Sequence, residues 1–418
     1  MAPRTGQEAG GGLDIEESSA HTLGWKNSFA ECESAGSPSY EDICSEKVDL
    51  PDKAGTCNPC AVIPAELREL ITDPKSVFPS LVPREGAAEN ISQLQLGQYR
   101  DLDVRELRCG KLFLREEAKG IGGVFAVGKS SGRQRKIWNG SAVSVAAASP
   151  PKPHRLANPS SFLDVEIQPD EPVFYSKRDA ATFFDVLQVP PELQTWFGQP
   201  PLYISELVAG GLTLSDIASF GNVPERQLEP KMLVFPVHAV WPMGFSWSSA
   251  VAQSTTVQTC VKAGRSEDAI LSPDYELPHT FDETCFVATD DTVLMHKSRA
   301  RGKHTLDRLN KAFEENGIPR NKGKDISLAE SITALGCDLS NGPPAMAEPS
   351  ARKLCNAVRR TLDLLHRRRA SPRGCHANFG VWQWFALLQR GFFSIFDSLY
   401  DFVRRSQLPK LSLCREGL

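Results

Sequence analysis

Long apolar stretches are missing from this 418-residue sequence, and so is an apolar N-terminal segment. No run of 18 apolar residues occurs, and even the most apolar stretch, at 379–396, contains Gln383, Gln389 and Arg390. A membrane-spanning helix and a signal peptide both need such runs. We therefore expect a protein that does not engage a membrane, is not secreted, and works inside the cell, in the cytoplasm or the nucleus.

Regular cysteine spacing is also missing, although the chain has 11 cysteines. Cys57 and Cys60 form a CxxC pair, and the nearest other cysteines, Cys32 and Cys44, lie in polar surroundings. A structural zinc site needs four ligands, and no second close cysteine pair or histidine pair completes this one. The pattern argues against a zinc site and indicates reduced thiols.

Charge is unevenly distributed along the chain, whose net charge is −4. Residues 1–60 carry 4 basic and 11 acidic side chains, and residues 296–418 carry 22 basic and 11 acidic ones, so the middle has a net charge of −8. An acidic centre followed by a basic third fits an enzyme with clustered carboxylates and an arm that binds phosphates. It also fits a surface that is merely uneven.

Composition and periodicity divide the sequence into four parts. Residues 1–62 are rich in Gly, Ser, Glu and Pro and show no periodicity, which predicts a disordered acidic tail. Strand-like runs with a β-hairpin follow in 63–161, and strands mixed with helices follow in 162–345. The part at 346–418 is mostly helical.

Two amphipathic helices are expected after residue 300. The segment HTLDRLNKAFEENGI has apolar residues at helical spacing and ends at Gly317, and the segment ARKLCNAVRRTLDLLHRRR repeats the pattern. The apolar positions are Leu306, Leu309 and Phe313 in the first helix and Leu354, Val358, Leu362 and Leu365 in the second.

The segment GVFAVGKS at 123–130 satisfies the phosphate-loop pattern G-x-x-x-x-G-K-[ST], but its surroundings do not fit. A phosphate loop needs a buried strand before it and a helix directly after it, so that backbone N–H groups face the phosphates. Here a charged stretch precedes Gly123, and SGRQRKIW after Ser130 predicts a turn into a strand. We therefore expect a β-hairpin and no nucleotide-hydrolase loop.

Two aspartates stand side by side within the apolar run CFVATDDTVLM at 285–295. A buried charge is costly unless it is paired or bound to a cation, which favours a turn between core strands that presents Asp290 and Asp291 to a metal. A polar hairpin tip is the alternative. Another carboxylate, Asp179, follows a predicted strand, or is a helix N-cap. Phosphoryl transfer to a growing nucleic-acid strand uses such carboxylates to hold two divalent cations about 4 Å apart.

In order along the chain, these segments resemble the conserved blocks of a reverse transcriptase, the right-handed polymerase of retroelements. RDAATFF (178–184) resembles the first palm block, WPMGFSWSSAVAQ (241–253) the second, and ATDD (288–291) the Tyr-x-Asp-Asp turn. NGIPRNKGK resembles the fourth block, LGCDLS the fifth, and GKSSGRQRKIW, upstream, the fingers hairpin. The similarity extends from about residue 105 to 345, and its strength lies in the order of the blocks.

Four positions depart from the family pattern, with Ala288 for Tyr, Met243 for the Gln before the motif glycine, Ser249 for Pro, and Asn139 for the Asp that usually ends the fingers hairpin. None of these changes removes a metal ligand. They fit a decayed genomic copy as well as a working one.

The resemblance implies a catalytic set with two Mg²⁺ ions, or Mn²⁺ in their place. Asp179 and Asp290 bind both ions, and Asp291 helps less directly. Lys322 or Lys324 donates a proton to the leaving pyrophosphate. These five residues form the catalytic set, and the three aspartates are the implied metal ligands.

The resemblance also implies binding residues. Phe184 packs against the sugar and excludes a 2′-hydroxyl, which favours deoxynucleotides, and Gly244 lets the backbone approach the template closely. The other implied nucleotide-binding residues are Lys129, Arg135, Ala180, whose carbonyl completes one ion's shell, and Met243. The implied nucleic-acid-binding residues are Arg359, Arg360 and Arg367.

The fold implied by the resemblance is an α+β right hand. It consists of fingers with the hairpin in 63–161, a palm of antiparallel sheet packed on helices in 162–345, and a helical thumb in 346–418. The segment around 190–235 is an inserted part of the fingers. The implied activity is that of an RNA-directed DNA polymerase, which extends a primer on an RNA or DNA template with dNTPs. The oligomeric state does not follow from it.

Two alternatives stay open. An RNA-dependent RNA polymerase shares the Asp-Asp turn and carries a second Asp after the first block to accept the ribose 2′-hydroxyl, and Asp185 stands near that position. Against it, Thr289 replaces that family's Gly before the Asp pair. A catalytically decayed nucleic-acid-binding remnant is favoured by Ala288 and opposed by the intact aspartates. No acidic set of a ribonuclease H follows the helices, so the chain resembles the polymerase segment of a longer element.

Overall fold

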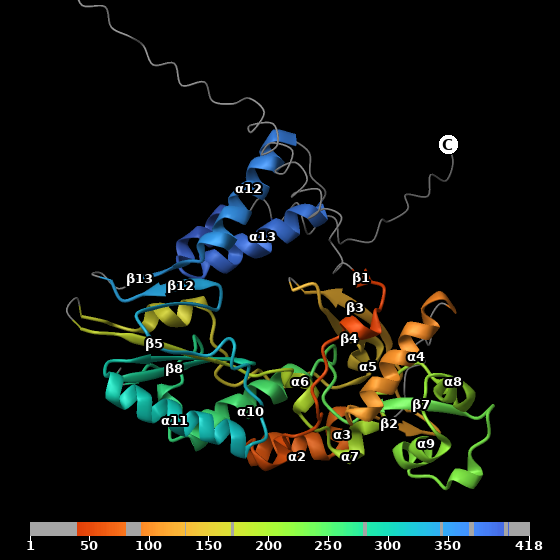
Figure 1. Cartoon of the computed structure of the whole chain (residues 1–418). Coiled ribbons are helices and arrows are strands. Elements are labelled where there is room, and N and C mark those ends of the chain that lie inside the picture. Colours follow the sequence, from red (N-terminus) through yellow and green to blue (C-terminus); the bar gives the residue numbers. More distant parts are fainter. Residues whose placement is uncertain are drawn as a thin grey trace, which may run out of the picture. The chain divides into compact units, whose positions relative to one another are not determined.

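The computed structural model describes residues 40–80, 93–129, 131–168, 171–278, 282–342, 346–367, 372–396 and 400. The architecture is mixed α and β, as the sequence predicts (Figure 1). The described residues form two compact units, one from residue 40 to residue 348 and one from residue 349 onward. Over these described ranges no helix combines the length and the apolar character needed to span a membrane.

A four-stranded antiparallel sheet forms the centre of the larger unit. In sheet order its strands are β10 (Ile326–Ala329), β5 (Phe174–Asp179), β9 (Asp291–His296) and β8 (Glu283–Ala288). Helices α10 (Ser248–Lys262) and α11 (Arg299–Glu315) cover one face of it (Figure 1). Val257 of α10 and Phe313 of α11 share one hydrophobic cluster with Leu294 of β9. The expected helix, Asp-Asp hairpin and strand before Asp179 are thus confirmed.

The insertion predicted around 190–235 builds a second sheet. Its strands, in order, are β2 (Leu112–Arg115), β7 (Leu233–His238) and β6 (Leu202–Tyr203). The helices that pack there are α4 (Gln93–Arg108), α8 (Ile204–Ala209) and α9 (Leu214–Gly221). Tyr99, Leu207 and Ile217 are fully or almost fully buried in a separate cluster. The segment around 190–235 therefore shares a core with α4 and β2, separate from that of the central sheet.

The β-hairpin expected in place of a phosphate loop is present. It consists of β3 (Gly123–Gly128) and β4 (Gln134–Asn139), which pair antiparallel along their whole length. The phosphate-loop match is itself a strand, and a second strand follows it where such a loop needs a helix. This confirms that the match is a coincidence of sequence.

The predicted disordered tail, residues 1–62, extends too far along the chain. Residues 1–39 lie outside the described residues, but 40–62 are packed: β1 (Tyr40–Glu41) pairs with β3, and Ile43, Val48 and Cys57 are buried. These apolar residues stand singly among polar ones, so average composition hides them. Burial raises the pKa of the Cys57 thiol to about 12, as expected for a core thiol and unlike a zinc ligand.

The smaller unit is helical, as predicted, with α12 (Ala351–Arg367), α13 (Pro372–Ala386) and the 3₁₀ segment η6 (Arg390–Phe396). Helix α12 has the predicted amphipathic pattern, although its apolar positions Leu354, Val358, Leu362 and Leu365 stay partly exposed. The indole N–H of Trp382 and the amide of Asn378, both on α13, donate to Thr361 Oγ1. Thr361 shares a helix face with Leu354 and Leu365, and all three line a cavity together with residues of α13, so this apolar face of α12 lies toward α13.

The remaining elements are short. They are η1 (Ser45–Lys47), η2 (Pro59–Ala61), α2 (Ala65–Thr72), α3 (Pro74–Val77), α5 (Ser141–Ala146), η3 (Pro159–Asp164), α6 (Phe183–Val186), α7 (Pro191–Gln194), η4 (Glu225–Gln227), η5 (Glu267–Ala269), β11 (Ser331–Ala334), β12 (Cys337–Ser340) and β13 (Met346–Pro349). Strands β11, β12 and β13 form a sheet of their own.

A group of ionisable side chains is buried between α4 and β4. Asp103 and Glu106 of α4 are fully buried, and the Lys136 side chain of β4 is 2% exposed. Lys136 Nζ contacts both carboxylates and lies 2.6 Å from Gln199 Oε1. Burial, together with the charge of Glu106, raises the pKa of Asp103 to about 7 although Lys136 opposes the shift. Asp103 therefore keeps a proton in the folded protein that it loses on unfolding.

This proton predicts a pH dependence of stability. Between the unfolded pKa of about 3.9 and the folded pKa of about 7, the folded state binds more protons at Asp103, so the free energy of unfolding falls as pH rises. Asp103→Asn removes this contribution, so we expect its free energy of unfolding to fall less steeply between pH 4 and pH 7. Urea unfolding at several pH values measures it, with the exposed Asp101→Asn as control. Equal slopes in wild type and Asp103→Asn would contradict the prediction.

Candidate active site at the β8–β9 turn

Strand register brings the three predicted aspartates to one end of the central sheet. Asp179, the last residue of β5, pairs directly with Asp291, the first residue of β9. The Ala180 N–H donates to the Asp290 carbonyl at 2.9 Å. Asp179 is therefore a strand end, and the cap of the following α6 is Thr182, so the N-cap alternative is wrong.

Helix α10 holds the turn that carries Asp290. Thr289 has a φ of +59°, in the left-handed region that β-branched residues disfavour. The Thr289 N–H donates to Gln253 Oε1, and its carbonyl accepts from Thr256 Oγ1, both at 2.7 Å. Gln253 and Thr256 are fully buried. Sequence reasoning missed both as site residues, although polar residues on the inner side of a helix were a signal.

Two lysines neutralise two of the aspartates. Lys324 Nζ lies 3.1 Å from Asp179 Oδ2, and Lys177 Nζ lies 3.0 Å from Asp291 Oδ1. Lys177 stands two residues before Asp179 on β5, which puts both side chains on one face of the sheet. Of the two lysines predicted for proton donation, the structure places Lys324 at the carboxylates.

Asp290 lacks such a partner within the part of the chain that the structure describes, where no basic side chain lies within ion-pair distance of its carboxylate. Burial, and then the charges of Asp291 and Asp179, raise its pKa. A carboxylate destabilised by like charges is stabilised when a cation binds beside it.

The residues fit a divalent hard cation in their chemistry. Carboxylate and carbonyl oxygens are the ligands that Mg²⁺ prefers, and Asp179, Asp290, Asp291 and the Ala180 carbonyl offer them. The described residues contain no group of three or more acidic, His or Cys side chains already arranged around a common point. The ion pairs with Lys324 and Lys177 account for this, because the carboxylates are turned toward ammonium groups.

Phe184, the residue predicted to select deoxynucleotides, lies in the turn after Asp179. Phe183 is buried in the core, whereas Phe184 is half-buried, with its ring centre 6.4 Å from that of Phe183. The Ala181 N–H donates to the Pro319 carbonyl at 2.8 Å, which ties the turn to the segment before Lys322 and Lys324.

Gly244 has a structural reason to be glycine. Its φ is +122°, and a Cβ atom there would lie 1.9 Å from the Trp138 carbonyl oxygen at the end of β4. The Trp138 N–H donates to the Met243 carbonyl at 3.2 Å. The predicted second block therefore lies against the hairpin, and a side chain at 244 would separate them.

The hairpin residues expected at a triphosphate differ in their surroundings. Lys129 Nζ lies 2.6 Å from Asp49 Oδ2, and Arg133 Nε binds the other oxygen of Asp49 at 2.7 Å. Arg135 is exposed on β4, because strand alternation turns the neighbouring Lys136 inward. Of the two predicted cations, Arg135 is thus the more accessible.

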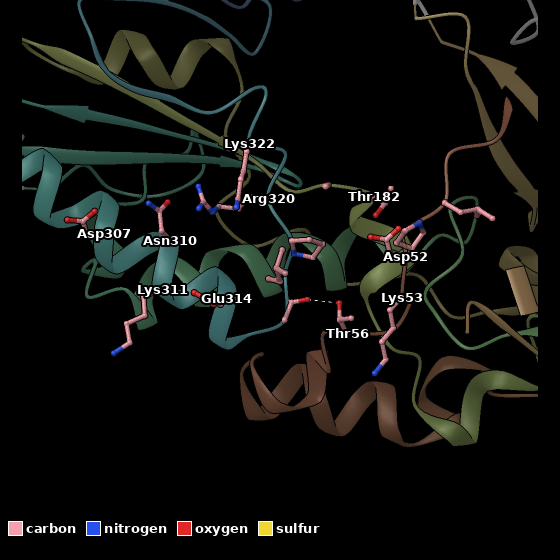
Figure 2. A pocket seen from close by; sticks show the side chains of 16 residues that line it. Asp52, Lys53, Thr56, Thr182, Asp307, Asn310, Lys311, Glu314, Arg320 and Lys322 are labelled. Atoms are coloured by element: carbon pink, nitrogen blue, oxygen red, sulfur yellow. Dashed lines mark hydrogen bonds between the residues drawn. The ribbon is translucent and has the colours of Figure 1, made fainter. Parts of the chain in front are cut away.

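A cleft of about 910 Å³ opens beside the turn that follows Asp179 (Figure 2). Ala181 and Thr182 border it directly after the aspartate strand, and α11 lines another side. Figure 2 shows Lys322 next to Arg320 at this cleft. Lys322 therefore lines this cleft, while Lys324 contacts Asp179.

The smaller unit offers a basic groove of its own. Arg359 is exposed and Arg360 is half-buried, while the side chain of Arg367 lies outside the described part. A groove of about 320 Å³ is lined by Lys353, Asn356, Ala357, Arg360, Gly380, Val381 and Trp384. Lys353 Nζ lies 5.7 Å from the centre of the Trp384 ring. The sequence analysis missed Lys353 and Trp384, which only the packing of two helices brings together.

We predict that the charge of Asp291 contributes to the high pKa of Asp290. In Asp291→Asn that pKa should fall, yet stay above its ordinary value because burial is the larger cause. An NMR titration of the Asp290 carboxyl carbon in metal-free protein measures it. Asp282→Asn, at the opposite end of β8, is the control and should leave the titration unchanged. An unaltered Asp290 titration in Asp291→Asn would refute the prediction.

Known structures share this architecture. A foamy viral protease-reverse transcriptase in complex with double-stranded DNA is 13% identical, with a TM-score of 0.51 over 97% of this chain and 58% of that one. A foamy viral protease-reverse transcriptase in complex with an RNA/DNA hybrid is 12% identical, with a TM-score of 0.51 over 96% and 44%. The chain thus spans about half the length of these proteins. No protein-family model and no curated protein sequence matches it. The chain has a reverse-transcriptase-like fold.

Proposed function

We propose that this protein is an RNA-directed DNA polymerase that adds dNTPs to a primer 3′-hydroxyl. The observation that carries the proposal is the convergence of Asp179, Asp290 and Asp291 at one sheet end of a reverse-transcriptase-like fold. In the proposed division, fingers lie in 63–161, a palm in 162–345 and a thumb in 346–418.

Asp179, Asp290 and Asp291 would hold two Mg²⁺ ions, with the Ala180 carbonyl completing one shell. When bound, such ions lower the pKa of the attacking 3′-hydroxyl and neutralise charge on the leaving pyrophosphate. The hairpin turn fixed by Gln253 and Thr256 keeps Asp290 in place. This anchoring reduces the reorganisation needed at the moment of reaction.

Lys324 is the cation closest to the proposed reaction. Its ammonium group lies 3.1 Å from Asp179, and its side chain is 60% exposed, so it can turn toward a leaving pyrophosphate and donate a proton. Lys322, in the neighbouring cleft, would hold the departing anion. Lys324 thus changes partner when the carboxylates bind metal.

The nucleotide would lie between the hairpin and the turn after Asp179. Arg135, with Lys129 once it leaves Asp49, would bind the triphosphate, because guanidinium and ammonium groups pair well with phosphate oxygens. Phe184 would contact the sugar and exclude a 2′-hydroxyl. Met243 and Gly244 would face the base pair from the second block.

The groove of the smaller unit supports nucleic-acid binding. Lys353 and Arg360 can contact phosphates, and Trp384 provides a flat apolar face. The two similar foamy viral proteins were solved with double-stranded DNA and with an RNA/DNA hybrid. We assign this groove, together with Arg359 and Arg367, to a primer–template duplex.

The RNA-dependent RNA polymerase alternative loses support from the structure. It needs Asp185 free to accept a ribose 2′-hydroxyl, but Asp185 Oδ1 lies 2.9 Å from Lys111 Nζ, which is 7% exposed. Breaking that pair would leave a buried ammonium group uncompensated.

A nucleic-acid-binding remnant is the second candidate. The observation that favours it is the pairing of Asp179 with Lys324 and of Asp291 with Lys177, which balances the carboxylates without metal. The two candidates share the fold and the groove, and differ only in turnover.

We predict primer extension on an RNA template with dNTPs and Mg²⁺ or Mn²⁺. Asp290→Asn and Asp291→Asn should each lower the rate at least about 100-fold, because each removes charge that stabilises the transition state. Asp282→Asn, an exposed aspartate at the far end of β8, is the matched control. Absence of extension by folded wild-type protein with either metal would favour the remnant.

We also predict that the basic groove binds the duplex through phosphates. Lys353→Ala and Arg360→Ala should each weaken binding of a primer–template duplex and reduce the salt slope by about 1. Fluorescence anisotropy at several salt concentrations measures both quantities. Arg226→Ala, an exposed cation of the insertion, should change neither. Salt slopes equal to that of the wild type in both groove variants would contradict the assignment.

A further inference from the structure

Three buried charged residues, Glu106, Lys136 and Lys111, and the partly exposed Asp185 form a continuous chain of ion pairs in the larger unit. Glu106 Oε1 lies 2.9 Å from Lys111 Nζ, and Glu106 Oε2 contacts Lys136 Nζ. Lys111 Nζ lies 2.9 Å from Asp185 Oδ1. Glu106 therefore bridges two lysines, one on β4 and one beside the turn after Asp179.

Stability alone does not explain these charges. The Glu106 side chain is fully buried, and those of Lys136 and Lys111 are 2% and 7% exposed. Buried ion pairs are often no more stabilising than apolar residues of the same volume, and their best-attested use is to set register. Burial alone would raise the pKa of Glu106, but the charges of Lys111 and Lys136 outweigh it and lower that pKa to about 2. The bridge thus stays ionised.

Backbone contacts fix the bridge in place. The Lys111 N–H donates to the Glu106 carbonyl, and the Lys111 carbonyl accepts from the Ala239 N–H, both at 2.9 Å. Beside the chain of charges, His238 is buried, and burial followed by the charges of Lys136 and Lys111 lowers its pKa, so that it stays neutral. Asp103 contacts Lys136 but not Lys111 in any pair within 4 Å. Glu106 is therefore the group that joins both lysines.

Each end of the chain of charges lies next to a residue of the proposed nucleotide site. At one end, Lys136 points inward from β4 and its neighbour Arg135 points outward. At the other end, Asp185 follows Phe184, and its N–H donates to the Thr182 carbonyl at 2.8 Å. The turn of 180–185 is thus anchored through the side chain of Asp185 as well as through its backbone.

We propose that Glu106 is a positioning residue that holds the triphosphate-binding hairpin strand and the nucleotide-selecting turn in register through Lys136, Lys111 and Asp185. The inference rests on the proposed polymerase function and deepens it. Selection of deoxynucleotides depends on where Phe184 stands relative to the sugar, and the triphosphate sets where the sugar lies. A bridge between the two parts fixes that relation, and displacements below 1 Å matter for reaction geometry.

Glu106→Gln tests the inference, because it keeps the shape of the side chain and removes the charge that both lysines share. We expect the KM for dNTP to rise about tenfold, and the preference for dNTP over rNTP to fall about tenfold, with a much smaller change in kcat. Steady-state primer extension with each nucleotide type measures these values. Affinity for the primer–template duplex should stay that of the wild type.

A residue with a purely structural role would affect stability and not nucleotide selection. Glu283→Gln breaks another partly buried ion pair, 2.7 Å from Arg265, away from the turn. It should lower the melting temperature and leave the KM and the dNTP preference unchanged. If Glu106→Gln does not fold, Asp185→Asn gives the same test from the half-exposed end of the chain of charges.

Each outcome decides the inference. A wild type that extends primers, with Glu106→Gln or Asp185→Asn showing reduced dNTP preference, supports it. Wild-type extension with an unchanged dNTP preference and KM in these variants overturns it and leaves the proposed function standing. Folded wild type without extension overturns the proposed function and, with it, this inference.

Discussion

The pairing of β5 with β9 is the constraint on which the site depends. Successive side chains along a strand point to opposite faces of a sheet, so a slip of one residue in the pairing would move every side chain of the strand to the other face. The register that places Asp179 opposite Asp291 is held by the apolar cluster between the sheet and helices α10 and α11. The placement of Asp179 opposite Asp291 is therefore a consequence of core packing.

The carboxylates at one end of the sheet repel one another, and two lysines from different segments offset part of this repulsion. Lys177 comes from the same strand as Asp179, and Lys324 comes from the segment before β10. Asp290 is the carboxylate without such a partner among the described residues, and burial followed by the charge of Asp291 raises its pKa. A cation that binds there competes with ammonium groups for Asp179 and Asp291, which links metal binding to a movement of Lys324.

Distant parts of the chain meet around this site through polar contacts. Segment 40–62 contributes Asp49 to the hairpin lysine and Thr56 to the Gly317 carbonyl, 2.6 Å away. Glu106 joins the hairpin to the turn after Asp179 from a third direction. Such contacts are directional, so they define the relative positions of elements more narrowly than apolar packing does.

The sequence alone determined the elements with local signals. Alternation and turn residues marked the hairpins at 123–139 and 283–296, helical spacing marked α11, and the order of the blocks indicated the family resemblance. Asp179, Asp290 and Asp291 were identified because carboxylates in apolar surroundings are conspicuous. These signals lie within a few residues of one another, which is why a linear sequence reveals them.

Only the tertiary structure decided which partners those residues have. In the structure, Lys324 and not Lys322 contacts Asp179, and Lys129 pairs with Asp49. Gly244 lies close to the backbone of Trp138. Within the apolar face of α12, Thr361 is the hydrogen-bond acceptor for Trp382 of α13. These choices depend on contacts between residues tens or hundreds of positions apart, where buried donors and charges take the nearest compatible partner, and no local pattern encodes which one that is.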